Sequence, residues 1–182
     1  MRAEQRVVVD VPDAIAVDRH RDFVGRRFHP WPRWVGLGAL VLFSALGLAN
    51  VFGQRPSTQV ADAAAAKLTL YAPTRARGGL LFSARFHVTA HQELKNAVLV
   101  LDPGWAEGMA INTIAPSPLG EGSKNGRLTF QLGHIPAGQS YILFMQFQVN
   151  PTNVAWHRLQ NVELDDGDTK VLTIERAITI YP

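Results

Sequence analysis

Residues Leu80–Ala90 read LLFSARFHVTA, and this stretch decides the fold of the chain. Apolar and polar side chains alternate along it, which is the period of a β-strand with one buried face. We expect the apolar members to face a core and the others to face outward. The inward set is Phe82, Ala84, Phe86 and Val88, and the outward set is Ser83, Arg85, His87 and Thr89.

Similar short runs with turn residues between them fill the rest of the C-terminal part. They are Lys67–Tyr71, Lys95–Leu101, Met109–Ala115, Arg127–Leu132, Ser140–Val149, His157–Leu164 and Thr169–Tyr181. No strong helical period separates these runs, so they predict an all-β fold, an antiparallel β-sandwich of about seven or eight strands.

The last run contains one residue that does not fit the alternation. Its apolar side chains share a parity that also turns Arg176 inward, and they are Leu172, Ile174, Ile178 and Ile180. Either a β-bulge near Glu175 shifts the register, or Arg176 has a partner inside the fold. We expect the bulge.

Upstream of the sandwich, Trp34–Phe52 reads WVGLGALVLFSALGLANVF and carries no charge. Roughly 20 apolar residues in a helix cross a hydrocarbon core of about 30 Å, so this run predicts a single transmembrane helix. A cleaved secretory signal is the alternative, because Gly47 and Ala49 have the spacing of a cleavage site. The long segment before the run favours an uncleaved signal anchor.

The residues that flank the span predict its orientation. Arg26, Arg27 and Arg33 precede it, and Arg55 alone follows it closely. Positive residues remain in the cytoplasm, so we expect a cytoplasmic N-terminus and an extracytoplasmic C-terminal domain at the plasma membrane. The arginines before the span, together with Trp31 and Trp34, are the expected membrane anchors, with the tryptophans at the interface.

These patterns predict four segments: a mostly disordered tail at 1–33, the span at 34–52, a linker at 53–66 and the sandwich at 67–182. The sequence pI is 9.6, but residues 57–182 contain ten basic and ten acidic side chains. The excess of positive charge precedes the sandwich, which argues against a nucleic-acid partner. There is no cysteine, so no disulfide or thiolate chemistry is expected.

The hairpin from His134 to Ser140, HIPAGQS, runs directly into the apolar segment Tyr141–Phe147. It resembles the turn of bacterial extracytoplasmic Ig-like modules of the conserved-repeat (CARDB-like) kind, and Val162–Asp168 and Thr179–Pro182 are similar in style. The resemblance spans roughly residues 67–182. It implies an Ig-like sandwich outside the cytoplasm, as in small single-pass membrane proteins of high-GC Gram-positive bacteria, and it implies no activity.

Two motifs have the composition of metal sites. His87 and His91 are four residues apart, but four residues of strand span about 13 Å, too far for one zinc ion without a chain reversal. The Asp165–Asp168 segment, DDGD, begins like a calcium loop but lacks the later ligands, and Asp-Gly between strands is first a hairpin turn. We therefore expect no metal and no cofactor, with a weak cation site as the alternative.

Trp105 follows the turn Asp102-Pro103-Gly104, and it is either a lid on the core or an exposed anchor for a partner. If each connection reverses the chain, the sandwich gathers several loops at the end far from the membrane. The candidate partner-binding residues there are Arg75, Arg77, Trp105, His134, Asp165, Asp166 and Asp168. The Gly-rich loop 116–126 is a rival surface at the near end.

No catalytic triad, phosphate-binding loop or paired-carboxylate motif is present in the sequence. We expect a non-catalytic, membrane-anchored domain that contacts the lipid bilayer through its helix and binds another membrane or envelope protein. A ligand- or cation-binding sensor is the alternative, and an enzyme is a third reading.

Overall fold

The structure is a computed structural model that describes residues 30–51 and 53–182. The chain forms two compact units that divide after Ala45, the second of which is Leu46–Pro182. The expected disordered tail falls largely on residues 1–29, which lie outside the described residues, as do Arg26, Arg27 and Phe52.

The apolar helix α1 spans Pro30–Leu48 and is long and apolar enough to cross a membrane. It begins and ends four residues earlier than the predicted span. Its end is set by Asn50, which takes the left-handed conformation with φ of 53°. The amides of Asn50 and Val51 then donate to the carbonyls of Gly47 and Leu46, the hydrogen bonds of a Schellman cap.

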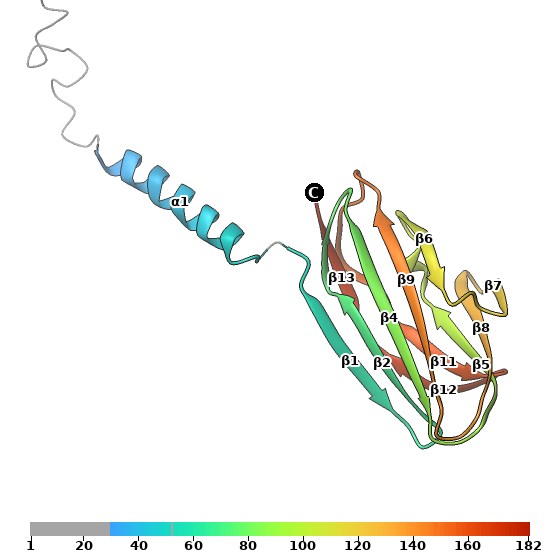
Figure 1. Cartoon of the computed structure of the whole chain (residues 1–182). Coiled ribbons are helices and arrows are strands. Elements are labelled where there is room, and N and C mark those ends of the chain that lie inside the picture. Colours follow the sequence, from blue (N-terminus) through green and yellow to red (C-terminus); the bar gives the residue numbers. More distant parts are fainter. Residues whose placement is uncertain (1–29, 52) are drawn as a thin grey trace, which may run out of the picture. The chain divides into compact units, whose positions relative to one another are not determined.

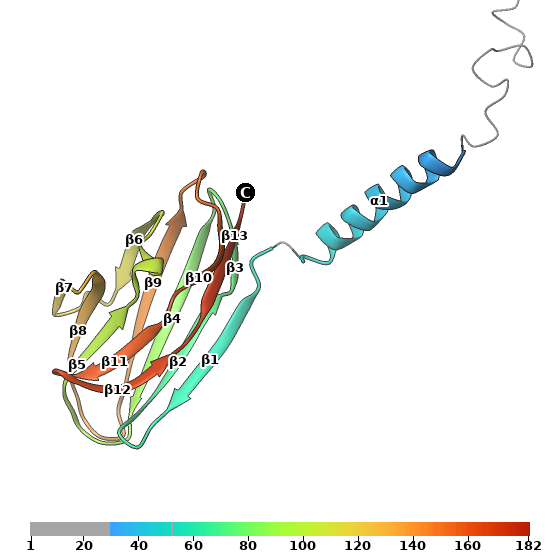
Figure 2. The same cartoon turned by 180° about the vertical axis from the view of Figure 1, so that it is seen from behind.

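Residues 53–182 form the predicted β-sandwich, shown in Figure 1 and from behind in Figure 2. One layer, sheet A, has the strand order β1-β2-β4-β9-β6. Its strands are β1 (Pro56–Asp62), β2 (Ala66–Pro73), β4 (Leu81–Ala90), β9 (Ser140–Val149) and β6 (Met109–Ala115). All pairs within this layer are antiparallel.

The opposite layer consists of two sheets. Sheet C has the order β12-β11-β5-β8-β7, and sheet B has the order β10-β13-β3. Their strands are β12 (Thr169–Ile174), β11 (Val162–Asp166), β5 (Leu94–Leu101), β8 (Arg127–Ile135), β7 (Gly120–Lys124), β10 (Ala155–Leu159), β13 (Ala177–Tyr181) and β3 (Arg75–Arg77). The β13–β3 pair is parallel.

The core between the layers confirms the faces predicted from alternation. Phe82, Ala84, Phe86 and Val88 are all buried, and Phe82 stacks on Phe147 of β9 with ring centroids 5.1 Å apart. The core also contains Trp105, which ends the short 3₁₀ helix η2 (Pro103–Trp105) and is fully buried.

The expected linker at 53–66 is wrong, because residues 56–62 form β1. This strand pairs with β2 along its whole length, from Pro56 opposite Pro73 to Asp62 opposite Lys67. An edge strand exposes more of its side chains than a central one, and β1 has the polar sequence PSTQVAD. Hydrophobic alternation is therefore too weak there to reveal the strand.

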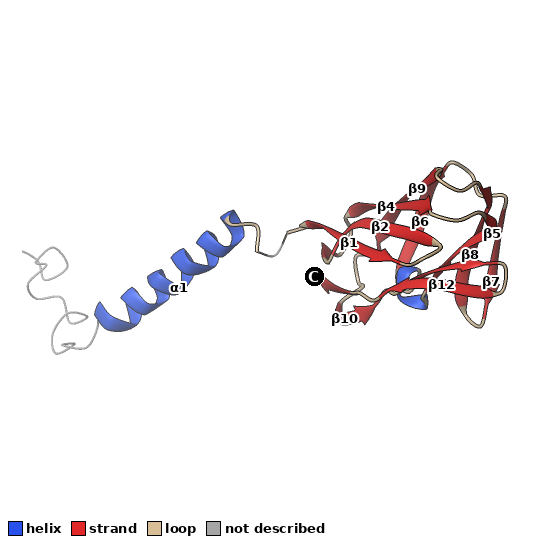
Figure 3. Cartoon of the chain, turned by 90° about the horizontal axis from the view of Figure 1, so that it is seen from below, coloured by secondary structure: helices blue, strands red, loops and turns tan. Residues whose placement is uncertain are grey.

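The extra strand β1 changes which loops share an end of the sandwich. We call the end where β1 begins, at Pro56, the linker end, and the end where it stops, at Asp62, the distal end. Because β2 runs antiparallel to β1, β2 finishes at the linker end and the short strand β3 follows there. Figure 3 shows β10 beside the C-terminus, where the last strand, β13, ends. Strands β10, β13 and β3 belong to the same sheet B.

The two last predicted strands are each divided in two, and the bulge expected near Glu175 is absent. The chain passes from sheet B to sheet C at Gln160–Asn161 and back to sheet B at Glu175–Arg176. The Gln160 amide donates to the Arg176 carbonyl at 2.9 Å, which joins the two crossings. Arg176 keeps its inward parity and is 5% exposed, and its guanidinium donates to the Pro73 carbonyl inside the fold.

Candidate functional site

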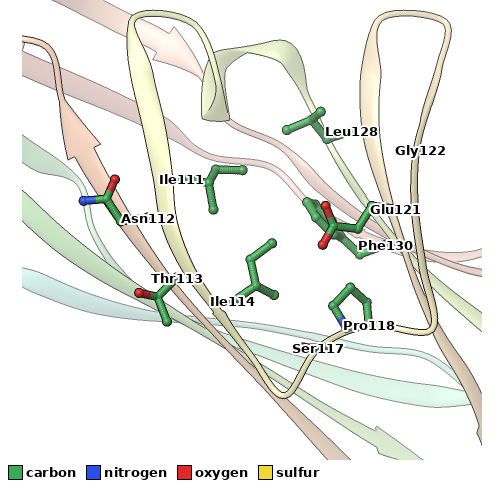
Figure 4. A pocket seen from close by; sticks show the side chains of 10 residues that line it. All are labelled: Ile111, Asn112, Thr113, Ile114, Ser117, Pro118, Glu121, Gly122, Leu128 and Phe130. Carbon is green, nitrogen blue, oxygen red and sulfur yellow. The ribbon is translucent and has the colours of Figure 1, made fainter.

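A pocket of about 410 Å³ lies on the open side of the sandwich, between the edge strand β6 of sheet A and the edge strand β7 of sheet C. Figure 1 shows these two strands on the side away from β1. Figure 4 shows the residues that line the pocket. They are Ile111, Asn112, Thr113, Ile114, Ser117, Pro118, Glu121, Gly122, Leu128 and Phe130.

An irregularity in β6 supplies two apolar walls of this pocket. Strict alternation would place Ile111 and Ile114 on opposite faces, because they are three positions apart. The register with β9 shifts between Ile111 and Thr113, so both isoleucines pack against the core side. Asn112 faces away, and its side-chain amide donates to Gln148 at 3.2 Å. The β-bulge therefore directs both isoleucines into the pocket.

The opposite wall comes from β8, where Phe130 is buried and Leu128 is half-buried. Pro118 closes one side, and the carboxylate of Glu121 projects from β7 toward the pocket (Figure 4). The lining includes no lysine, arginine or histidine. The site therefore combines an apolar floor with a single acidic group at its rim.

The edge strand beside the pocket differs from the other edges of the fold. In the described part of the chain the sheets end in β1, β6, β10, β3, β12 and β7. Every one of these carries a charged side chain except β6, MAINTIA. Charged residues on an edge hinder pairing with another chain, so β6 lacks this common protection.

A second pocket, of about 360 Å³, lies on the outer face of sheet A. Its lining consists of Thr58, Thr69, Tyr71, Arg85 and His87. Tyr71 lies opposite Arg85 in the β2–β4 register, and Thr69 lies opposite His87. Every residue that lines this hollow carries a polar group, and the hollow is open on a sheet face whose neighbouring residues Val60 and Ile142 are exposed.

The outer face of sheet C holds a network of charges. The Arg127 guanidinium donates to Asp102 at 2.9 Å and to Glu163 at 3.4 Å, and Lys170 lies 3.0 Å from Glu163. Burial opposes the charge of Glu163, but Lys170 and Arg127 outweigh it and lower the pKa of that carboxyl. Burial likewise opposes the charge of Arg127, whose pKa the two carboxylates nevertheless raise.

Asp165 lies two residues from Glu163 on the same strand and differs from it. Burial first, and then repulsion from Glu163, raises the pKa of Asp165. One of its carboxylate oxygens is buried without a hydrogen-bond partner. The two carboxyl groups are thus shifted in opposite directions, because Arg127 and Lys170 form ion pairs with Glu163, whereas the more distant Arg127 and Lys124 do not offset the burial of Asp165.

Trp105 is not an exposed anchor, and the reading as a lid on the core is confirmed. Its side chain is fully buried, and its indole NH donates to the Gln160 carbonyl at 3.0 Å. It contacts Phe86 and Phe147, with centroid distances of 5.5 and 5.2 Å. Contacts inside the core thus account for this residue.

The other candidate partner-binding residues do not gather at one end. Arg75 and Arg77 lie on β3 at the linker end, which is the reverse of the expected position. His134 pairs with Glu93 at 2.9 Å, close to the distal end, where the β4–β5 and β8–β9 connections meet. Asp165, Asp166 and Asp168 belong to the β11–β12 hairpin of sheet C. The undetected strand β1 reversed the expected direction of the strands from β2 to β6, and the undetected strand β7 restored it from β8 onward.

The histidines and aspartates with metal-like spacing have other partners. His91 lies 2.9 Å from Asp62, and the Asp166 carboxylate accepts the Asn96 amide at 2.7 Å. Gly167 has φ of 63° between β11 and β12, which confirms the hairpin turn. Within residues 30–51 and 53–182, no group of three or more His, Cys, Asp or Glu is placed to hold a metal ion.

The sequence did not predict the pocket at β6 as a site, although some of its residues lie in the loop 116–126. Ser117, Pro118, Glu121 and Gly122 belong to the Gly-rich loop proposed as the rival surface. Residues 120–124 of that loop form β7, whose glycines gave no alternation. The absence of charge in Met109–Ala115 was the available signal for an open edge.

No protein-family model matches the chain, and no curated protein matches it. Similar solved structures include AvmM, which catalyses macrocyclization in alchivemycin A biosynthesis, at 8% identity and a TM-score of 0.43 over 71% of this chain and 90% of that one. A von Willebrand factor type A structure from Catenulispora acidiphila matches at 17% identity and a TM-score of 0.35, over 50% of this chain and 24% of its own.

A GH20 exo-β-N-acetylglucosaminidase from Vibrio harveyi matches at 11% identity and a TM-score of 0.31, over 70% of this chain and 18% of that enzyme. The chain thus spans a quarter or less of the last two proteins. Likenesses this distant assign no activity. The resemblance to conserved-repeat Ig-like modules stays a prediction.

Proposed function

We propose that the chain is a membrane-anchored interaction module whose sandwich binds a partner protein outside the cytoplasm, without catalysis. Helix α1 is the anchor, with its N-terminus in the cytoplasm, because Arg26, Arg27 and Arg33 precede the apolar run. The partner is another protein of the membrane or cell envelope, since the anchor holds the sandwich close to the bilayer.

The observation that carries this proposal is the uncharged edge strand β6 beside a pocket with an apolar floor. An extended segment of another protein can add to such an edge through backbone hydrogen bonds, while alternate side chains enter a neighbouring pocket. Ile111, Ile114 and Phe130 would receive an apolar side chain. Glu121 at the rim favours a basic residue next to it.

The pocket supports binding better than catalysis. Its ionisable lining consists of Glu121, and no base lies in the lining to activate the hydroxyl of Ser117. The charged network on sheet C is bound up in mutual ion pairs through Arg127 and Lys170. Such networks perturb pKa values for structural reasons as well as functional ones.

The test is site-specific photo-crosslinking of the full chain in its native membrane. A photoreactive residue in place of Thr113 on β6 should give one strong adduct with a partner. The same residue in place of Thr58, on the edge strand β1 of the same sheet, is the matched control. Equal adducts from both positions, or none from β6, would refute binding at this edge.

A small apolar ligand is the second candidate, because the volume of about 410 Å³ falls within the range of roughly 300–1,000 Å³ found for ligand sites. Mass spectrometry of an organic extract of the purified full chain tests it. A compound that accompanies the wild-type protein and is absent from the Ile114→Glu variant would favour a sensor over a protein-binding module.

A further inference from the structure

The linker-end half of the sandwich exposes a group of large apolar side chains that do not line the pocket at β6. Trp156 is 75% exposed, Leu159 64%, Val154 59% and Leu80 49%. We call these four residues the linker-end patch. Clustered exposed apolar side chains on a folded domain commonly mark a surface that contacts a protein or a membrane.

The backbone turns this patch outward. Strand β10 is an edge of sheet B, and its register with β13 shifts between Ala155 and Arg158. His157, inside this irregularity, has φ of 53°. The rings of Trp156 and His157 lie 5.4 Å apart, outside the core. The contrast with the fully buried Trp105 shows that the fold does not need Trp156 as a core residue.

Arginine side chains lie next to the patch. Arg75 and Arg77 stand on β3, which pairs with β13, and β13 in turn pairs with β10. Arg77 is exposed. The carboxylate of Glu107 lies 3.7 Å from Arg158 and is thereby compensated, whereas Glu175, at the strand break, is exposed. This half of the sandwich therefore joins apolar and aromatic side chains with three arginines, Arg75, Arg77 and Arg158, against the two carboxylates of Glu107 and Glu175.

The chain length keeps this end near the anchor. Helix α1 ends at Leu48 and β1 begins at Pro56. A fully extended connection of that length spans about 28 Å. Pro56 pairs with Pro73, and β3 follows directly after Pro73. The end that bears the patch is therefore always within a short reach of the last residue of α1.

We infer that the linker-end patch docks on the surface of the bilayer that α1 spans. Trp is favoured at the membrane–water interface, where its ring is partly apolar and partly hydrogen-bonded. Trp156 and Leu159 enter the interfacial region, and Arg77 faces anionic headgroups, to which basic residues near the surface are attracted. The inference rests on α1 being the anchor, and it is independent of what binds at β6.

The chain has no cysteine, so a single label can be placed at will. The full-length variants Leu159→Cys and Leu119→Cys, each labelled with nitrobenzoxadiazole, are reconstituted into vesicles of equal parts phosphatidylcholine and phosphatidylglycerol. Leu119 is the matched control, an apolar residue 78% exposed, in the connection beside the pocket. Lipids with a nitroxide at the headgroup should quench the label at 159 at least twice as strongly as the label at 119.

A second variant separates docking from simple proximity. Adding Trp156→Ser and Arg77→Ser to the Leu159→Cys chain should reduce its quenching to the level of the control. Equal quenching of the two single-label proteins, in vesicles that carry the chain on flotation, would overturn the inference. Equal quenching is also the result expected if another protein or a second copy covered the patch instead of the bilayer. Failure of the chain to float would instead refute the anchor itself.

Discussion

The guanidinium carbon of Arg176 lies 4.9 Å from the centre of the Trp105 ring, and both residues are buried. Arg176 also donates to the carbonyl of Pro73 at the end of β2. Gln160 joins the same group, since its carbonyl accepts the Trp105 indole NH. The arginine and the tryptophan thus fix the place where the chain passes between sheets B and C.

Replacing Trp105 with alanine should lower the free energy of unfolding by about 3–5 kcal/mol, as is typical of removing a large buried aromatic side chain. Trp156→Ala is the control, and it should change stability by no more than about 0.5 kcal/mol, because its ring is exposed. Denaturant unfolding of the two variants measures both values. Similar losses would show that Trp105 does not have the central packing role assigned to it.

Replacing Arg176 with methionine should leave the protein as stable as the wild type, or more stable. Burial lowers the pKa of Arg176 to about 10, from 12.5. That shift corresponds to about 3 kcal/mol of unfavourable free energy for the buried charge. Methionine would fill the same space without that cost, at the loss of one hydrogen bond from a charged group, worth about 1.5–3 kcal/mol.

Arg176→Ala should be destabilising, since it removes the packing of the long side chain on Trp105 as well as the charge. Thermal unfolding of the methionine and alanine variants separates the two contributions. A methionine variant as unstable as the alanine variant would mean that the charge on Trp105 stabilises the fold more than its burial costs.

Asp165→Asn should stabilise the protein at pH 7. The pKa of Asp165 is raised above its ordinary value of 3.8, so the folded state disfavours the ionised carboxylate relative to the unfolded state. The contribution of Asp165 to the free energy of unfolding therefore falls as the pH rises through the window above 3.8. Asparagine does not ionise, so the variant avoids this loss of stability. The gain in melting temperature should vanish when both proteins are compared below that window.

Glu163→Gln is the mirror-image variant for the same experiment. Its pKa is lowered from 4.5, so its stabilising contribution is present at neutral pH and is lost as the pH falls through the window below 4.5. The variant should therefore be less stable at pH 7 and converge with the wild type in acid. Stabilisation by Glu163→Gln would contradict the ion-pair network described for sheet C.

A fragment of residues 53–182 should fold alone as a soluble β-rich protein, whereas a fragment of residues 66–182 should aggregate. Without β1, the longer strand β2 becomes an edge, and its alternating sequence AKLTLYAP offers an unpaired partner to other chains. Circular dichroism and size-exclusion chromatography distinguish the two fragments. A monomeric, folded 66–182 fragment would restore the view that residues 53–66 serve as a linker.

Hydrophobic alternation predicted the strands that have one buried and one solvent-exposed face. The limits of β6 and β9 were predicted to the residue, because each run is bounded by turn residues. The strands β1, β3 and β7 lack that contrast, since they are polar, three residues long or glycine-rich. Of the three, β3 pairs with β13, which is distant in sequence, whereas β1 and β7 form hairpins with the next strand and were hidden by their weak alternation alone.

The candidate site was hidden for a related physical reason. The bulge in β6 turns Ile111 and Ile114 to the same side, whereas alternation alone separates them. The burial of Arg176 was likewise set by its long-range contacts with Trp105 and Pro73. Sequence patterns report local periodicity, and both features depend on contacts between distant segments.

The most direct test of partner binding at β6 asks whether a charge on that edge abolishes contact at the pocket. The full chain carries a photoreactive residue at Ser117, on the pocket wall. Adding Thr113→Lys should reduce the partner adduct at least tenfold, because the lysine hinders strand addition, while Thr58→Lys on β1 should leave the adduct unchanged. An adduct that persists with Thr113→Lys would contradict strand addition at β6.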